Sequence, residues 1–437
     1  MHSEHRKKLI EALTEETGIV WIKGASPMNR YNTDYEFAFR QESNFLYLTN
    51  CHEPDFEVII DLDDQQYYLI APKRDANYAV WMGFVPEKEE LLERYKPDTL
   101  LYSDERDAFL KKRNPEKVFC LDAEQAKEIS DLGFSTDDNL LADALAHCRC
   151  IKTEWECNQL RSASAIAFVA HTKVRQMLKP GLFEYELKAA YLQEAMSRGL
   201  LHEPYNGIFA GGKGSAVLHY VDNNRKLKDG DLFLIDAGTE YNGYAADITR
   251  TYPVNGRFTD LQADLYEVCL RALNNSIAKA GPGVEMETLH LEAARDIVTG
   301  MKGIGLLKGN IDEMMEKNIF ALFFPHGLGH FLGLDTHDVG GIPKNCEPVD
   351  RPGLKFLRAR RKLEPGMVIT IEPGVYFIPA LLKPAFEDPE KNPYLNVEKL
   401  STMMDFGGYR IEDNLIITED GVENLTRVPK RLREISN

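Results

Sequence analysis

Two aspartates stand on either side of a tight-turn signal in the stretch LIDAGTEYNGYAADITRTY. If Asn242 and Gly243 form a two-residue hairpin turn, Asp236 faces Thr249 and is a diagonal neighbour of Asp247 on one face. Diagonal neighbours are roughly 7 to 8 Å apart, near enough for two carboxylates to bind one or two cations. Without a cation, two carboxylates at the edge of a core would repel each other. The hairpin is therefore a candidate metal site; the alternative for this stretch alone is a pair of solvated or helix-capping aspartates.

A glycine-rich segment further along, FFPHGLGHFLGLDTHDVGG, contains three histidines. They are His326, His330 and His337, and the glycines between the first two disfavour a helix. The segment is therefore not the HExxH motif of helical zinc proteases. One core histidine would be unremarkable, but this density of imidazoles is unlike the interior of a helix or strand. We expect a loop that supplies imidazole groups to a site.

Further carboxylates stand on two predicted strands near the C-terminus. MVITIEPGVY predicts an apolar strand that has Glu372 at its end and is stopped by a Pro-Gly pair. GGYRIEDNLIITEDG predicts another strand, with Arg410 and Glu412 on one face and Asp413 on the other. Alternation alone does not choose between Glu412 and Asp413 as the partner of Glu372.

These residues together favour a metal centre. Four carboxylates could not all stay ionised in one cleft, whereas two divalent cations would balance their charge. An oxygen-rich set with a single imidazole favours Mn²⁺ or Co²⁺ as much as Zn²⁺. The set also lacks the thiolates of a structural zinc site.

The elements that would carry these residues follow a repeated order. Thr153 and Glu156 form a capping-box signature at the start of a long apolar-periodic stretch. Strand-like segments follow each pair of predicted helices, which cover residues 154–178, 183–198, 260–280 and 285–301. This order indicates two α+β halves, although no repeat is visible at the residue level.

The first 150 or so residues have a different pattern. A helix over about 4–16 is followed by the strand GIVWIKG and the hairpin FEVIIDLDDQQYYLIAP. Strands that alternate with helices predict an α/β domain with a mixed sheet, and no cluster of reactive side chains stands out in it. We therefore expect two domains, residues 1–152 and 153–437, with the site in the second.

Composition narrows the functional class. A chain of 437 residues with 43% hydrophobic residues can build more than one core. Its formal charge of −17 argues against a nucleic-acid or anionic-membrane binder. Seven cysteines without a CxxC pair favour a reducing compartment, and no apolar run is long enough for a signal peptide or membrane span. We expect a soluble, cytoplasmic protein whose partner is a small molecule or another protein.

Six motifs resemble those of the prolidases, the Xaa-Pro dipeptidases of the pita-bread metallopeptidase family. They are VLHY, LIDAG-x8-D, PHGLGHFLG, HDVGG, LEPGMVITIEPGVYFI and GGYRIEDN. The resemblance covers about residues 155–430 and extends to the N-terminal part through FAFRQESNFLYLTN and EPDFEVIIDLD. It implies an α+β pita-bread fold preceded by a creatinase-like α/β domain. It also implies hydrolysis of Xaa-Pro dipeptides by a hydroxide held between two divalent metal ions, with Mn²⁺ favoured and Co²⁺ or Zn²⁺ as alternatives.

The resemblance also implies roles for residues around the metal ions. The implied metal ligands are Asp236, Asp247, His330, Glu372 and Glu412, with Asp247 and Glu412 bridging. Glu372 is in addition the implied proton acceptor. His337 and His326 are implied hydrogen-bond donors to the developing oxyanion, with the alternative that His326 only orients a ligand.

A further set of implied residues surrounds the substrate. The resemblance places Tyr205, Ile208 and His219 in the pocket for proline, and Arg358 at the free carboxylate of the dipeptide. Arg410 and Thr249 are expected to contact the ligand carboxylates from outside the metal site and to orient them. The segment VDNNRKLKDGD is shorter than in animal prolidases, so the preferred first residue of the substrate stays open.

Other members of the same fold family, and a binding protein, are alternatives to a dipeptidase. Aminopeptidase P, the nearest, removes the residue before proline from longer peptides with the same metals. Methionine aminopeptidase and the creatinase-like enzymes match less well, because they lack the Arg358 insertion or this ligand set. A metal-free binding protein is the remote alternative. The family resemblance further implies a homodimer.

Overall fold

The computed structural model describes residues 2–436, which fall into two compact units, Met1–Arg149 and Cys150–Asn437. Each unit has a hydrophobic core of its own. Within the described residues, no helix has both the length and the apolar character needed to cross a membrane.

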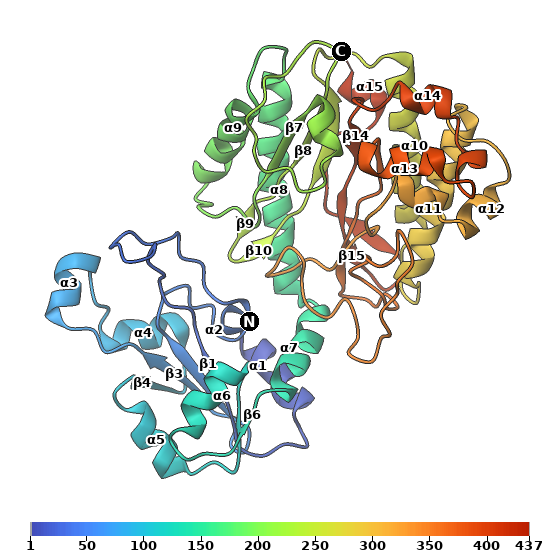
Figure 1. The fold of residues 1–437 in the computed structure, drawn as a ribbon. Helices are drawn as coiled ribbons and strands as arrows, with labels where there is room; N and C mark the ends of the chain where they lie inside the picture. The colour runs from blue at the N-terminus through green and yellow to red at the C-terminus, as the bar shows by residue number, and fades with distance from the viewer. Residues whose placement is uncertain (1, 437) are drawn as a thin grey trace. The chain divides into compact units, whose positions relative to one another are not determined.

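Unit 1 (Met1–Arg149) is built on a six-stranded mixed sheet in the order β4-β3-β2-β1-β5-β6 (Figure 1). The predicted hairpin is confirmed, since β2 and β3 pair antiparallel, whereas β4, β5 and β6 run parallel to their inner neighbours. The strands are β1 (Ile19–Lys23), β2 (Glu57–Asp61), β3 (Tyr67–Ala71), β4 (Thr99–Tyr102), β5 (Val118–Phe119) and β6 (Thr136–Asp137). The helices are α1 (His2–Ala12), α2 (Ser43–Thr49), α3 (Ala76–Met82), α4 (Lys88–Tyr95), α5 (Arg106–Arg113), α6 (Ala123–Ser130) and α7 (Leu140–Cys150).

The first half of unit 2 (Cys150–Asn437) begins with a capped helix, α8 (Glu154–Met177). The capping box is confirmed: the Thr153 amide donates to Glu156 Oε2 at 2.8 Å, and the Glu156 amide donates to Thr153 Oγ1 at 3.4 Å. The elements that follow are α9 (Glu184–Met196), β7 (Ile208–Gly211), the short 3-10 helix η1 (Gly212–Ala216), β8 (Leu232–Asp236), β9 (Glu240–Tyr241), β10 (Tyr244–Ala245) and β11 (Thr249–Pro253). The three longer strands form a sheet in the order β11-β8-β7.

The hairpin between β8 and β11 has the register that the sequence predicts. Thr249 pairs with Asp236, and at the tip Tyr244 pairs with Tyr241. Asn242 and Gly243 have φ angles of 50° and 85°. Positive φ at both central residues is the geometry that a two-residue turn between twisted strands requires, and it explains the Asn-Gly dipeptide.

The second half repeats the order of helices followed by strands. Its elements are α10 (Asp260–Lys279), α11 (Met286–Gly303), α12 (Ile311–Glu316), η2 (Ile319–Leu322), β12 (Val368–Ile371), β13 (Gly374–Tyr376), α13 (Pro379–Glu387), η3 (Asn392–Tyr394), α14 (Val397–Ser401), β14 (Gly408–Arg410), β15 (Asp413–Ile417), β16 (Val422–Asn424) and α15 (Leu432–Ile435). All four helices predicted for the two halves are present, and the histidine segment is a loop.

The two strands that carry glutamates are interrupted at the glutamates. The strand β12 ends before Glu372, and the chain re-pairs as β13 against β14. The prediction that this strand stops at the Pro-Gly pair is confirmed, but the sequence did not predict that the chain would pair again directly afterwards. Pro373 has no N–H for a ladder, but its carbonyl still accepts from the Ile411 amide at 3.4 Å, which keeps the broken ends together.

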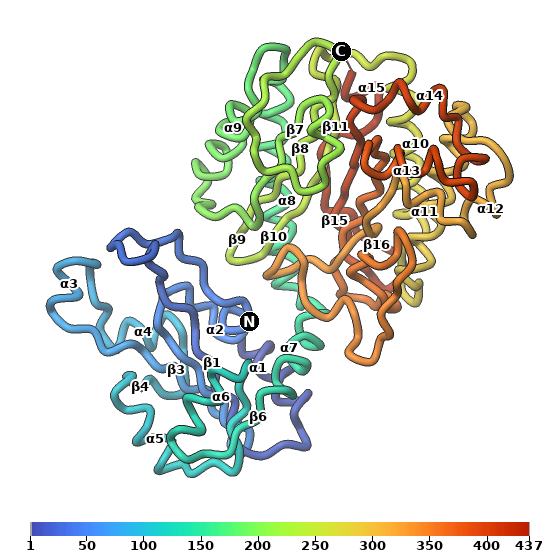
Figure 2. Tube along the Cα trace, viewed as in Figure 1, coloured from blue at the N-terminus to red at the C-terminus, as the bar shows by residue number. Residues whose placement is uncertain are grey.

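The two halves meet beside β11. The Glu412 amide donates to the carbonyl of Thr249 at 3.0 Å, and the Thr251 hydroxyl donates to the carbonyl of Arg410 at 3.0 Å. Figure 2 shows the traces of β8 and β11 beside the β14–β15 segment. This junction brings carboxylates from both halves to one place, although they are far apart in the sequence.

Candidate metal centre

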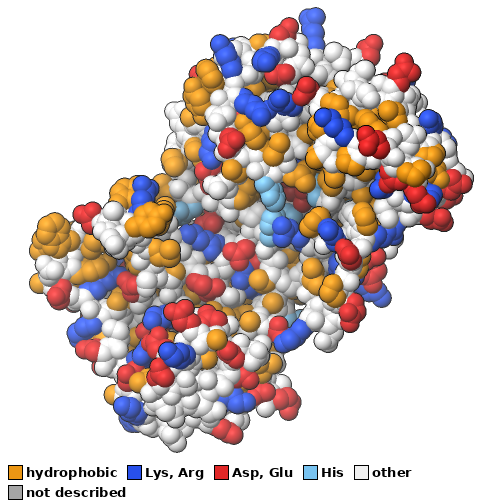
Figure 3. All heavy atoms as spheres, in the orientation of Figure 1, with side chains coloured by type: hydrophobic (Ala, Val, Ile, Leu, Met, Phe, Trp, Pro, Cys, Tyr) orange, Lys and Arg blue, Asp and Glu red, His pale blue; other side chains and the backbone are white. Residues whose placement is uncertain are grey.

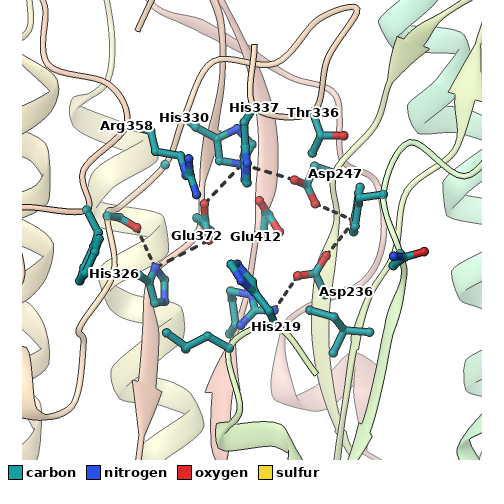
Figure 4. Close-up of a pocket in the computed structure, with 18 of the residues that line it drawn as sticks. His219, Asp236, Asp247, His326, His330, Thr336, His337, Arg358, Glu372 and Glu412 are labelled. Atoms are coloured by element: carbon teal, nitrogen blue, oxygen red, sulfur yellow. Dashed lines mark hydrogen bonds and ion pairs between the residues drawn. The ribbon is translucent and has the colours of Figure 1, made fainter. Parts of the chain in front are cut away.

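The predicted site residues line one cavity of about 750 Å³ in unit 2, and the labelled side chains point towards its centre (Figure 4). Those that line it are Tyr205, Ile208, His219, Asp236, Asp247, His326, His330, His337, Arg358, Glu372, Arg410 and Glu412. Thr249 lies behind the wall, on β11, where its side chain is fully buried. Segments that are far apart in the sequence thus contribute to one site.

The closest group of potential ligands is Asp247, His330 and Glu412, whose ligand atoms all lie within 4.8 Å of one another. Glu372 extends this group, since its Oε1 is 3.5 Å from His330 Nε2, while Asp247 Oδ2 is 3.4 Å from the same nitrogen. All four side chains are largely shielded from solvent. The imidazole therefore stands between carboxylates from both halves of the unit.

The orientation of His330 follows from its second ring nitrogen. Nδ1 lies 2.9 Å from the carbonyl of Phe331, so it carries a proton, and this bond holds the ring with Nε2 facing the carboxylates. The His330 amide donates to Thr370 Oγ1 at 3.1 Å, and the Thr370 amide donates back to the His330 carbonyl at 2.9 Å. The loop that carries the imidazole is thereby tied to β12.

Asp236 and Asp247 share a tyrosine. The Tyr205 hydroxyl is 2.7 Å from Asp236 Oδ1 and 2.6 Å from Asp247 Oδ1. Tyr205 was expected in the proline pocket; it lines the cavity, but its hydroxyl is directed at the two carboxylates. Because a phenol has one proton, it can donate to only one of two ionised carboxylates at a time. Its role includes holding the aspartates in place.

Arg410 holds the opposite side of Asp236. Its Nη2 donates to Asp236 Oδ2 at 2.5 Å, and its Nη1 donates to the Tyr376 hydroxyl at 2.8 Å. Its Nε donates to Thr249 Oγ1 at 3.2 Å, and Thr249 in turn donates to Glu412 Oε2 at 2.7 Å. Arg410 and Thr249 thus both donate hydrogen bonds to carboxylates that line the cavity.

The next residue after Glu412 belongs to a different network. Asp413 accepts from Arg250 Nη2 at 2.9 Å and also from Lys430 and Asn424, and its side chain is fully buried. Asp413 is thus neutralised by two cations in the core, whereas Glu412 lines the cavity. The structure therefore shows that Glu412, and not Asp413, faces the cavity, a choice that strand alternation left open.

His326 is connected to a tyrosine that the sequence analysis did not single out. Its Nδ1 is 2.8 Å from the Gly327 carbonyl and its Nε2 is 2.9 Å from the Tyr376 hydroxyl. Both ring nitrogens are therefore engaged within the protein, which favours the orienting role for His326. A signal for Tyr376 existed: it stands four residues after Glu372 in the same strand motif, which puts both on one face.

Electrostatics at the site reflect carboxylates buried close together. Burial raises the pKa of Glu372 to about 7, and burial together with neighbouring carboxylates raises the pKa of Asp236 and of Glu412. Asp247 is the exception, since its bond to His330 outweighs burial and lowers its pKa. The same partner effect raises the pKa of His330. Without bound cations, this site therefore takes up protons when the protein folds.

The donor set fits a pair of divalent cations. It offers four carboxylates and one imidazole, with no cysteine, which is the chemistry preferred by Mn²⁺ and accepted by Co²⁺ and Zn²⁺. Among the described residues, Arg410 is the guanidinium that bonds to a ligand carboxylate, and it faces four acidic groups. Divalent cations would supply the missing positive charge.

The raised pKa values predict how the metal-free protein responds to pH. A carboxyl whose pKa is higher in the folded state contributes stability below its unfolded pKa and loses it as the pH rises through the folded pKa. For Glu372 the window is from about 4.5 to about 7, and the loss is on the order of 3 kcal/mol. Asp236, Glu412 and His330 act in the same direction, and Asp247 opposes them. Chemical denaturation with a chelator present should show a lower free energy of unfolding at pH 7.5 than at pH 5. Saturating Mn²⁺ should remove this difference. Equal stability of the metal-free protein at both pH values would contradict the electrostatic account.

Comparison with known families and proteins agrees with these observations. A family model described as metallopeptidase family M24 matches residues 158–419, and one described as aminopeptidase P, N-terminal domain, matches residues 2–119. The chain is 39% identical to the Xaa-Pro dipeptidase of Rattus norvegicus, over 99% of this chain and 92% of the rat protein. It is 38% identical to a probable Xaa-Pro aminopeptidase of Colletotrichum graminicola, over 94% of this chain and 90% of that protein.

A solved structure extends the comparison to the fold. Zinc-substituted aminopeptidase P from E. coli, in complex with product, superposes with a TM-score of 0.83 at 32% identity. The match covers 100% of this chain and 97% of that chain. The expected α+β pita-bread fold with an N-terminal α/β domain is confirmed.

Proposed function

The chain belongs to metallopeptidase family M24, and from this membership we propose that it is an Xaa-Pro dipeptidase that depends on two divalent metal ions. The observation that carries the proposal is the convergence of Asp247, His330 and Glu412 in a cavity that also contains Arg358. All of the proposed site residues lie in residues 153–437, which we take as the catalytic domain, with 1–152 as the N-terminal domain.

The proposed ligands of the ions are the five residues implied by the family resemblance. Asp236, Asp247, His330, Glu372 and Glu412 would hold the ions. Bound divalent cations supply Lewis-acid chemistry, which lowers the pKa of water and polarises the scissile carbonyl. We favour Mn²⁺ because the donors are mostly carboxylate oxygens.

The protein's own residues move the protons of the reaction. Glu372 is placed to accept a proton from the attacking water while the water oxygen bonds to the carbonyl carbon. When the C–N bond breaks, the same carboxyl returns that proton to the proline nitrogen, so the products are a free amino acid and proline. His337, whose pKa burial lowers to about 4, is neutral and keeps one N–H to donate to the oxyanion.

The proline ring requires an apolar surface that makes no demand for an N–H, because the Xaa-Pro bond is a tertiary amide. Ile208, which is almost fully buried on β7, and His219 line the cavity and are the proposed contacts. Exposed Phe356 lines the same cavity two residues before Arg358. Arg358 is the proposed partner of the dipeptide carboxylate, since a guanidinium pairs with a planar carboxylate through two hydrogen bonds.

Two glycines determine where the Arg358 segment can lie. A Cβ at Gly341 would be 2.3 Å from the carbonyl oxygen of Arg358, and a Cβ at Gly327 would be 2.8 Å from Cα of Leu357. Contacts this short do not occur, so either substitution would displace the segment. The position of Arg358 therefore depends on the absence of side chains at residues 327 and 341.

Gly341→Ala is expected to raise KM for Ala-Pro by about tenfold with little change in kcat, because carboxylate binding weakens while the metal ligands stay in place. The measurement is steady-state kinetics at saturating Mn²⁺. The matched control is Gly303→Ala, where a Cβ would meet no atom within 4 Å. An unchanged KM in Gly341→Ala would show that Arg358 does not depend on this contact.

Aminopeptidase P activity is the second candidate, because relatives of that name also match the chain. The two activities differ in the substrate they need, since only the dipeptidase requires a free carboxylate directly after proline. The experiment compares Ala-Pro, Gly-Pro and Ala-Pro-Ala after reconstitution with Mn²⁺, Co²⁺ or Zn²⁺. We expect cleavage of the dipeptides alone. Cleavage of Ala-Pro-Ala at a similar rate would support the aminopeptidase. No activity with any of the three metals would support a binding protein.

We also propose a homodimer, supported by apolar side chains on the surface of unit 1. Figure 3 shows hydrophobic side chains gathered around α3, a helix in which no residue is buried. The exposed side chains of unit 1 include Met28, Tyr31, Tyr35, Phe37, Val80, Trp81, Met82 and Phe84. Such a surface usually marks a protein interface. Sedimentation analysis should give twice the chain mass.

A cytoplasmic location is proposed from the cysteine content. Cell fractionation tests this location.

A further inference from the structure

A buried histidine stands behind the metal centre, outside the cavity. His290 lies on the first turns of α11 among Met286, Leu289 and Ala293, and its side chain is fully buried. Its ring packs on Phe324 with a centroid distance of 5.1 Å. An apolar residue would fill this position without the free-energy cost of burying two ring nitrogens. We therefore expect the imidazole to make a hydrogen bond that an apolar residue could not make.

That hydrogen bond is made to the histidine loop. The Leu328 amide donates to Nδ1 of His290 at 3.1 Å. Since a backbone amide can only donate, Nδ1 must be the unprotonated acceptor and the proton is on Nε2. Burial lowers the pKa of His290 to about 4, so the acceptor form persists at neutral pH.

Leu328 occupies the middle of the segment between His326 and His330. Its amide is bound by His290, and its carbonyl accepts from the Glu372 amide at 2.7 Å. The backbone of Leu328 therefore joins α11 to the interrupted end of β12. A shift of Leu328 would change the position of His330 relative to Glu372, and these two side chains are 3.5 Å apart at their nearest ligand atoms.

We propose that His290 is a positioning residue, which through the Leu328 backbone sets the placement of His330 and Glu372. The inference rests on the proposed dipeptidase function for its catalytic consequence, but the hydrogen bond itself is independent of that function. Residues that orient metal ligands from outside typically change activity by about 10- to 100-fold when they are replaced. The required feature is a hydrogen-bond acceptor at the position of Nδ1.

Two substitutions separate this acceptor from the packing of the ring. His290→Asn keeps an oxygen near the position of Nδ1, whereas His290→Leu fills a similar volume without an acceptor. We expect His290→Leu to lower kcat for Ala-Pro by about 10- to 100-fold with KM nearly unchanged, and His290→Asn to recover most of that loss. Ile297→Ala, a buried position further along the same helix, is the control for lost stability alone.

A second readout needs neither metal nor substrate. Hydrogen–deuterium exchange of the metal-free protein reports the amide of Leu328 in peptides that cover residues 324–332. We expect faster exchange of this segment in His290→Leu, near wild-type exchange in His290→Asn, and no change in Ile297→Ala. Equal impairment of the Asn and Leu variants, or wild-type exchange and kcat in the Leu variant, would overturn the proposal. A wild-type protein that is inactive on Ala-Pro would refute the proposed function, and the exchange data would still decide the role of His290.

Discussion

Replacing Asp247 with asparagine is expected to lower kcat/KM for Ala-Pro by about 10³-fold at saturating Mn²⁺. Asp247 is the carboxylate that joins the two sides of the site, since it lies against His330 and shares the Tyr205 hydroxyl with Asp236. The amide of asparagine keeps the shape of the side chain and removes its charge. The loss should therefore come from the missing negative charge at the metal centre, with the fold retained.

A backbone hydrogen bond holds the chain at Asp247 independently of its carboxylate. Its backbone amide donates to Asn414 Oδ1 at 3.0 Å, a bond that the substitution leaves in place. Circular dichroism should accordingly be unchanged, and Asp260→Asn, at an exposed aspartate in the first turn of α10, serves as the control for loss of one acidic group. An Asp247→Asn variant that keeps more than about a tenth of the wild-type kcat/KM would contradict the assigned role.

Replacing Arg358 with methionine is expected to lower kcat/KM for Ala-Pro by about 10- to 100-fold, mainly through KM. Arg358 is exposed at the cavity, so its charge is hydrated until a substrate covers it. Methionine keeps the length and the apolar stem but removes the five N–H donors. The substitution should therefore remove recognition of the free carboxylate and leave the metal ligands unaffected.

A neutral substrate distinguishes recognition from general damage. The wild-type protein should prefer Ala-Pro to its C-terminal amide, and Arg358→Met should abolish most of that preference without slowing cleavage of the amide. Lys355→Met, at an exposed cation three residues earlier, controls for the loss of a positive charge in the segment. Equal losses on both substrates would show that Arg358 supports the structure and does not read the carboxylate.

Local patterns predicted those parts of the structure that a short segment determines. The hairpin that carries Asp236 and Asp247 depends on an Asn-Gly turn and alternating residues, and its register came out as expected. The start of α8 depends on the capping box of Thr153 and Glu156. In both cases, the hydrogen bonds that decide the geometry lie within a few residues of one another.

Contacts between distant segments could not be predicted in this way. The choice of Glu412 over Asp413 depends on Arg250 and Lys430, which neutralise Asp413 from another strand and from the C-terminal loop. The contact of Tyr205 with two aspartates, and that of His290 with Leu328, likewise join residues more than 30 positions apart. Alternation and helical period say which face a side chain is on, but not which segment faces it.

The interruptions at Glu372 and Glu412 show a second limit. A pattern of alternating residues predicts a continuous strand, whereas both glutamates stand where the ladder is broken. A break allows a carboxylate to turn into the cavity while the flanking residues still pair. Such breaks are set by the packing of the two halves against each other, which no single segment encodes.

The number of cations bound by the metal-free protein tests the central claim most directly. Isothermal titration with Mn²⁺, checked by elemental analysis of the dialysed complex, should give two ions per chain for the wild-type protein. A stoichiometry of zero, or of a single ion even at saturation, would contradict a centre built from these five side chains.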